Sequence, residues 1–420
     1  MLLLRTVVIL LSCALVPLAQ AQTPSKPSQP TPSRRGRTVS KKADPRKQFV
    51  MDVVQTAVAL PQSNSQDRLR VLNSATMVSA PVAPQTARRL AREGAQIEQE
   101  LVGRGEVPAV SILSSGYVPC ATVREFVDSL TVESLPAAEE SLMGALSVCH
   151  KHVADVARLK IETGLNRGVI AARPLLALME QTGPKTQWSQ TQFRRMFTSL
   201  PKDAAAYREA ANFAAMYVRM APELDKDIAR RTGIAFLEWL AKIEDSGERN
   251  LAANMTLDAM RGIFDEKEME DGLASSIIAQ QMARNVGPGE IRHEEYESAS
   301  VLEAMGNVGA DRTEQLRELP PSQRAREAAA HGFASGTNGQ RQMAERYFDM
   351  AFSAVDEYWS ERGSSDQAAA VVEEVSEAAA HVDPVAALVR AQKLDEPSAQ
   401  AIGMLAVARV VLGQTEEQAR

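Results

Sequence analysis

The sequence predicts an all-α fold, and three observations support this prediction. The chain has 420 residues, of which 45% are hydrophobic and 24% are charged, a composition typical of globular proteins. It is rich in Ala, Glu, Gln, Arg, Leu and Met, which form helices readily, and β-branched runs between turn residues are nearly absent. Proline and glycine recur at intervals that suit short-linked helices. We therefore expect stacked antiparallel helical hairpins, the arrangement of an α-solenoid.

Residues 1–21 have the features of a bacterial-type secretory signal peptide. Arg5 precedes an almost unbroken apolar run, and Ala19 and Ala21 are the small residues that a signal peptidase requires. We expect cleavage after Ala21 and an exported chain, either periplasmic or secreted. Two alternatives stay open: the segment stays uncleaved as an anchor, or Cys13 is acylated at a lipobox-like sequence.

Residues 22–44 are expected to form a disordered basic tether. Proline and serine are frequent there, which favours an extended chain, and residues 23–47 carry +7 with Asp44 as their one acid. Because the whole chain carries −6 and Arg5 contributes one positive charge, residues 48–420 carry −14. Such an acidic body has no electrostatic reason to bind nucleic acid. The tether is a candidate for contact with an anionic envelope surface.

Helix breakers divide the rest of the chain into four parts. Residues 45–102 are expected to form a small N-terminal helical unit, and residues 103–119 an irregular joint that is either a short strand pair or an ordered loop. Helical hairpins are expected over residues 120–320 and again over residues 321–420.

Particular residues mark the predicted helix ends. Asp44 followed by Pro45 is a helix start, with an N-cap and a proline in the first turn. Breaks are expected further along the chain at Leu135-Pro136, Gly183-Pro184, Leu200-Pro201, Ala221-Pro222, Ser246-Gly247, Gly287-Pro288-Gly289, Pro320-Pro321, Thr337-Asn338-Gly339, Gly363, Asp383-Pro384 and Glu396-Pro397.

Cys120 and Cys149 are a possible disulfide pair. They are the two cysteines that remain after cleavage of the signal peptide, and an even number in an exported chain favours a bridge. They are expected on successive helices, where a bridge would stabilise the fold by about 3 kcal/mol in the chain-entropy model. Two buried free thiols are the alternative.

Five residues within positions 325–356 match the tetratricopeptide repeat in type and spacing: Gly332, Gly339, Ala344, Phe348 and Ala351. The segment resembles that family, in which small residues let two antiparallel helices pack closely. The resemblance implies that Gly332 lies in the first helix and Gly339 in the turn. It implies further that Ala344 and Ala351 face back across the pair and that Phe348 fills the space between repeats.

The match is partial. Ala328 stands where an aromatic residue is usual, Ser335 where Tyr is usual, and Asp356 where Pro often closes the unit. Residues 402–419 resemble the first helix and turn of such a repeat more weakly. The resemblance implies a stacked helical scaffold whose concave face binds another protein or a peptide, and it implies no chemistry.

No catalytic, cofactor-binding or metal-ligating residue is predicted, and no cofactor. His293 has no second histidine one turn further on, so the zinc-protease motif is absent. His150 and His152 lie two positions apart on a helix and point to different sides. The aromatic residues mostly recur at helical spacing, which is typical of core packing.

The leading hypothesis is therefore an exported, non-catalytic helical-repeat scaffold that binds another protein or a peptide in the cell envelope. One alternative is a secreted or periplasmic enzyme of the cell-wall hydrolase type, with a hidden catalytic carboxylate. Such an enzyme would have one deep pocket with a carboxylate buried against apolar walls, where burial raises its pKa. Another is a purely structural envelope protein. The partner, the number of repeats and the oligomeric state stay open.

Overall fold

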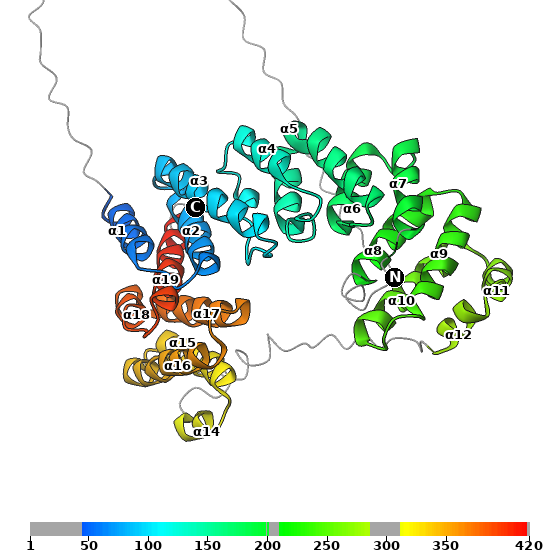
Figure 1. The fold of residues 1–420 in the computed structure, drawn as a ribbon. Coiled ribbons are helices and arrows are strands. Elements are labelled where there is room, and N and C mark those ends of the chain that lie inside the picture. The colour runs from blue at the N-terminus through cyan, green and yellow to red at the C-terminus, as the bar shows by residue number, and fades with distance from the viewer. Residues whose placement is uncertain (1–43, 199, 201–209, 286–310, 418–420) are drawn as a thin grey trace, which may run out of the picture. The chain divides into compact units, whose positions relative to one another are not determined.

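The computed structural model describes residues 44–198, 200, 210–285 and 311–417. Helices make up the secondary structure of these residues and no strand occurs among them, which confirms the all-α class (Figure 1). The predicted signal peptide and the predicted tether as far as residue 43 lie outside the described residues. None of the described helices combines the length and the apolar character that crossing a bilayer requires.

The described residues up to 240 form nine α-helices and two short 3₁₀ helices: α1 (Pro45–Ala59), α2 (Ser65–Ser79), α3 (Pro84–Gly103), η1 (Ile112–Ser115), α4 (Cys120–Ser129), α5 (Glu139–Asn166), α6 (Ala172–Thr182), α7 (Gln187–Thr198), α8 (Ala210–Met220), η3 (Ala221–Glu223) and α9 (Lys226–Leu240). The helices that follow are α10 (Gly247–Ile263), α11 (Glu266–Ala274), α12 (Ile277–Asn285), α14 (Thr313–Arg317), α15 (Pro321–Thr337), α16 (Arg341–Arg362), α17 (Asp366–Val382), α18 (Pro384–Ala391) and α19 (Pro397–Glu417).

Most helix boundaries follow from capping residues and helix breakers. Asp44 caps α1 by accepting a hydrogen bond of 3.0 Å from the Arg46 amide, and Pro45 occupies the first turn. Asp383 caps α18 in the same way, ahead of Pro384. Every predicted break for which both sides are described lies at a helix end, except Leu135-Pro136, which lies in the segment between α4 and α5. Pro201 and the predicted break at residues 287–289 lie outside the described residues.

The segment 103–119 contains one 3₁₀ turn, η1, so the strand-pair alternative is wrong and the ordered loop is correct. Its order comes from Glu98 on α3, whose side chain is fully buried. The Glu98 carboxylate accepts a hydrogen bond of 2.9 Å from the Ile112 amide at the start of η1, and another from the Ser141 hydroxyl on α5. A side-chain acceptor from a neighbouring helix therefore fixes a loop whose own sequence has no regular pattern.

The helix α19 is buried along most of its length. Residues 401–408 are all buried, because α19 packs against α1 and α2 from the start of the chain and against α17 and α18 from its end (Figure 1). Such a helix needs apolar or small residues on all sides rather than on one stripe. The weaker resemblance over residues 402–419 implies a turn near Gly413, and this expectation is wrong because α19 continues to Glu417. A single helical glycine costs only about 1 kcal/mol relative to alanine, which the buried surface of α19 offsets.

Between these ends of the chain, neighbouring helices pack in pairs. α4 packs against α5, α5 against α6, α8 against α10, and α9 against α10 and α12. Aromatic side chains from α7, α8 and α9 meet in one cluster, in which the ring centroids of Phe197 and Phe236 are 5.3 Å apart and those of Phe213 and Trp239 are 5.7 Å apart. These rings are buried, as their helical spacing predicts.

Candidate functional site

The structure joins Cys120 and Cys149 by a disulfide bond. Cys120 is the first residue of α4 and Cys149 lies within α5, with their Cα atoms 5.5 Å apart. The α5 backbone leaves helical geometry at Cys149, with φ −116° and ψ 24°. Arg124 on α4 also pairs with Asp155 on α5 through two hydrogen bonds of 2.8 Å, and this contact lowers the pKa of Asp155 to about 2. The disulfide thus belongs to a structural connection between two helices.

The residues that resemble the tetratricopeptide repeat lie in the hairpin formed by α15 and α16. Gly339 is in the connecting turn with φ +77°, a conformation that favours glycine. Gly332 lies on α15 directly against Phe348 on α16: a Cβ atom at position 332 would be 2.9 Å from the Phe348 ring. Ala344 and Ala351 on α16 are buried. The hairpin therefore depends on small residues where its two helices approach most closely.

The position of Phe348 differs in part from what the resemblance implies. Its ring contacts Gly332 within the hairpin, rather than lying only between one hairpin and the next. The departures at Ala328 and Ser335 also have a physical reason. Both side chains are buried because α15 packs against α16 and also against α17, which leaves no space for an aromatic ring.

Small residues also occur where the following helices approach one another. A Cβ atom added to Gly336 on α15 would lie 2.5 Å from Val382 at the end of α17. A Cβ atom added to Gly403 on α19 would lie 2.9 Å from the Ser376 hydroxyl on α17 and 3.1 Å from Ala391 on α18. The contacts α15–α17 and α17–α19 are thus as close as that within the hairpin, and neither Gly336 nor Gly403 is among the residues that carry the resemblance.

A groove of about 200 Å³ lies between α15 and α16 on one side and α17 and α18 on the other. We call it the α16–α18 groove. Its apolar lining consists of Gly336, Ala344, Phe348, Ala379, Val382 and Ala386, and its charged lining of Arg341, Glu345, Asp383 and Arg390. The groove is smaller than the cavities that bind drug-sized ligands, so its size suits an apolar side chain.

The charges around the α16–α18 groove are paired with one another. The Arg341 side chain lies 3.1 Å from Glu345 and 3.7 Å from Asp383, and it is 79% exposed. Arg390 donates a hydrogen bond of 2.8 Å to Asp349. Exposed pairs of this kind contribute little to stability and exchange partners readily. An apolar floor with an exposed, mixed-charge rim resembles the surface patches at which protein segments bind.

Glu98 meets one part of the criterion for a hidden catalytic acid, because burial raises the pKa of its carboxyl group. However, its two oxygens are occupied by the Ile112 amide and the Ser141 hydroxyl. It also lines neither the α16–α18 groove nor a second, larger cleft that lies between α7 and α9. The surroundings of Glu98 therefore fit a structural carboxyl group that orders η1.

Within the described residues, no three His, Cys, Asp or Glu side chains are grouped so as to hold a metal ion. The predicted site residues at 332–351 come together in one hairpin, whereas Cys120 and Cys149 lie elsewhere, on α4 and α5. Sequence reasoning missed the contribution of α17 and α18 to the groove, because Ala379 and Val382 lie on α17 whereas Ala386 lies on α18, beyond the helix break at Asp383-Pro384. Comparison of the chain with models of protein families, with curated proteins and with solved structures found no match.

Proposed function

We propose that this chain is an exported, non-catalytic scaffold of stacked helical hairpins that binds a protein or peptide partner in the cell envelope. The observation that carries the proposal is the α16–α18 groove, an apolar cleft with a charged rim that is built from two successive hairpins. A binding surface that requires neighbouring hairpins to assemble is typical of helical-repeat proteins.

The packing order of the C-terminal helices supports the repeat part of the proposal. α15 pairs with α16 and α17 with α18, while α15 contacts α17 and α17 contacts α19. In a solenoid the first helix of each hairpin packs against the first helix of the next, and small residues permit that approach. Gly336, which lies against α17, and Gly403, which lies against α17 and α18, supply such small residues.

We propose that the groove receives an apolar side chain of the partner. Phe348 and Val382 would contact this side chain, and Arg341 and Glu345 at the rim would hydrogen-bond to the backbone or to polar neighbours of the bound segment. The apolar contact supplies most of the affinity, whereas the charged rim gives specificity. Export rests on the predicted signal peptide. The basic tether would contact an anionic envelope surface and let the acidic body sit away from the membrane.

The experiment is a selection from a displayed random-peptide library with the purified chain, followed by measurement of the affinity of a selected peptide. Ala386→Trp places a large side chain in the groove. Val385→Trp is the matched control, because Val385 is the preceding residue of α18, is 67% exposed and does not line the groove. We expect Ala386→Trp to weaken binding at least about tenfold, which corresponds to the loss of one well-buried apolar contact.

The proposal predicts selected peptides that share an apolar residue and bind Val385→Trp like the original chain. Peptides that bind both variants equally would place the binding surface elsewhere. Failure to select any peptide, together with release of fragments from purified cell wall, would support the hydrolase alternative instead. Amino-terminal sequencing of the exported chain tests the predicted start at Gln22.

A further inference from the structure

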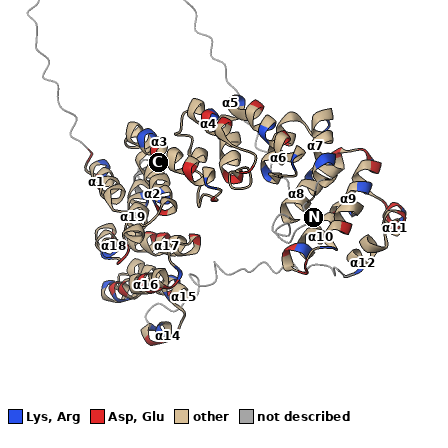
Figure 2. Ribbon diagram, in the orientation of Figure 1, with Lys and Arg blue, Asp and Glu red and all other residues tan. Residues whose placement is uncertain are grey.

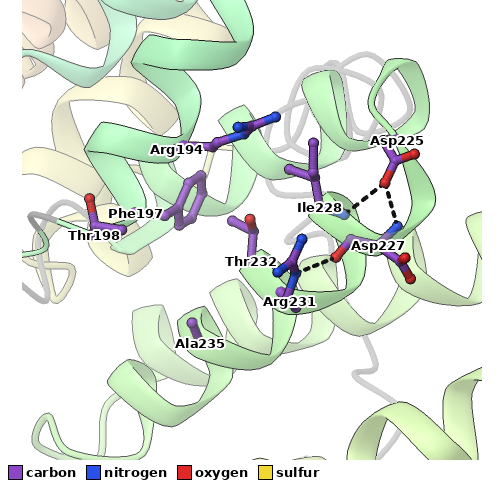
Figure 3. A pocket seen from close by; sticks show the side chains of 9 residues that line it. All are labelled: Arg194, Phe197, Thr198, Asp225, Asp227, Ile228, Arg231, Thr232 and Ala235. Atoms are coloured by element: carbon purple, nitrogen blue, oxygen red, sulfur yellow. Dashed lines mark hydrogen bonds between the residues drawn. The ribbon is translucent and has the colours of Figure 1, made fainter.

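A second cleft lies between α7 and α9, far along the chain from the α16–α18 groove. It measures about 550 Å³, and Phe197, Ile228 and Ala235 contribute apolar surface to it. Figure 3 shows Arg194 extending from α7 toward Ile228, while Arg231 and Thr232 extend from α9. The cleft therefore combines an apolar wall with two guanidinium groups from different helices.

The two arginines differ from most arginines of this chain. Figure 2 shows basic and acidic residues interspersed along the same helices, and many of them form ion pairs; Arg230, for example, pairs with Asp227. Arg194 and Arg231 are exposed, and neither pairs with a carboxylate among the described residues. Arg231 donates one hydrogen bond of 3.2 Å to the Asp227 carbonyl, which uses only its Nε. Its terminal nitrogens make no hydrogen bond or ion pair with the part of the chain that the structure describes.

The acids that line the cleft do not neutralise these arginines. The Asp225 carboxylate caps α9 by accepting hydrogen bonds from the amides of Asp227 and Ile228, at 3.0 and 3.4 Å (Figure 3). The Asp227 carboxylate is engaged by Arg230. Among the described residues, the two arginines of the cleft thus have no carboxylate partner, although residues 48–420 as a whole carry −14. Cations that line a cleft with apolar walls attract a negatively charged ligand.

We propose that the α7–α9 cleft binds an acidic peptide segment of a partner protein. A Glu or Asp carboxylate of the segment would lie between Arg194 and Arg231, because a planar guanidinium matches the geometry of a carboxylate and binds it through two hydrogen bonds. The Thr232 hydroxyl offers a further donor. An apolar residue next to that acid would pack against Phe197 and Ile228, which a free inorganic anion cannot do.

The test measures the fluorescence anisotropy of a short fluorescein-labelled peptide in which Glu alternates with Leu. The same peptide with Gln in place of Glu is the control ligand. Arg194→Gln and Arg231→Gln each remove one charge from the cleft. Arg195→Gln is the matched control, because Arg195 is an exposed residue of the same helix that does not line the cleft. We expect each cleft variant to weaken binding at least about tenfold and the control variant to bind unchanged.

Loss of binding on exchange of Glu for Gln, and weaker binding at higher salt, would support the proposal. Equal effects of Arg195→Gln and Arg194→Gln would overturn it, because the attraction would then be a general surface effect. Displacement of the peptide by inorganic phosphate at an equal concentration would also overturn it, in favour of a free-anion site. The Ala386→Trp variant should bind this peptide as the original chain does. A negative result at the α7–α9 cleft can therefore be distinguished from a negative result at the α16–α18 groove.

Discussion

Ser398 donates a hydrogen bond of 3.0 Å to the carboxylate of Asp67, although 331 positions separate the two residues. Asp67 lies on α2 and is fully buried, and Ser398 lies at the start of α19. The same carboxylate accepts a hydrogen bond from Ser364 and is paired with Arg70 at 3.2 Å, and Arg70 also pairs with Asp366. One buried carboxylate therefore connects the first helices of the described chain to its last.

The first prediction concerns this carboxylate. Asp67→Asn should lower the free energy of unfolding by about 3 kcal/mol, because Arg70, whose side chain is only 10% exposed, loses its buried charged partner. Urea unfolding measures the change, and hydrogen exchange locates it: amides of both α2 and α19 should exchange faster. Asp52→Asn is the control, because Asp52 is an exposed acid of α1, and it should change stability by less than about 0.5 kcal/mol. Faster hydrogen exchange in α2 but not in α19 would contradict a role of Asp67 in stabilising both helices.

The second prediction concerns the disulfide. Replacement of both Cys120 and Cys149 by Ala should lower the unfolding free energy by about 3 kcal/mol, because the bridge closes a loop between residues that are 29 positions apart. Adding a reductant to the original chain should have a similar effect, and should not change the variant. Hydrogen exchange should increase first in α4, whose remaining ion pair with α5, between Arg124 and Asp155, is exposed. Unchanged exchange in α4 would disprove a stabilising role.

The third prediction concerns the close contact in the α15–α16 hairpin. Gly332→Ala should destabilise the protein by about 1–3 kcal/mol although alanine favours helices, because the new Cβ atom would overlap the Phe348 ring. Gly262→Ala in α10 is the matched control: nothing lies within 4 Å of its added Cβ atom, so it should be neutral or slightly stabilising. In a double-mutant cycle, Phe348→Leu should reduce the penalty of Gly332→Ala. Additive effects of Gly332→Ala and Phe348→Leu on the free energy of unfolding would show that positions 332 and 348 do not interact.

The fourth prediction concerns the pH dependence that Glu98 contributes. Burial raises the pKa of Glu98 above its unfolded value, so between these two values the folded state binds more protons than the unfolded state. The contribution of Glu98 to stability therefore decreases as pH rises through that window and stays low above it. Glu98→Gln, which keeps one acceptor and gains a donor, should be at least as stable as the original chain at neutral pH. The difference in stability between Glu98→Gln and the original chain should shrink as the pH falls toward the pKa that Glu98 has in the unfolded state.

Glu98→Ala provides the contrasting variant. It leaves the buried Ile112 amide without its acceptor, so it should lower stability by about 1–3 kcal/mol at neutral pH. Thermal unfolding at several pH values measures both variants. If Glu98→Gln were as destabilising as Glu98→Ala, the negative charge itself would be required, which would contradict the structural role assigned to this carboxyl group.

Local chemistry made much of the secondary structure predictable. Asp44, Asp383 and the prolines that follow them mark helix starts because capping and a fixed φ act within one turn of the chain. Gly332 and Gly339 were predictable as parts of a hairpin because a short turn brings neighbouring helices together at known spacing. The end of α19 was not predictable, since Gly413 lies in a helix that is held in place by surrounding helices rather than by its own sequence.

The sequence by itself determined that the chain is helical, where most helices begin and end, and which small residues make the α15–α16 hairpin. Only the tertiary structure decided that α19 lies between α1–α2 and α17–α18, that Asp67 bonds to Ser398, and that Arg194 and Arg231 face one cleft. The reason is physical. Helix propensity and capping act over a few residues, whereas contacts between distant helices depend on how whole buried surfaces fit together, which no local pattern encodes.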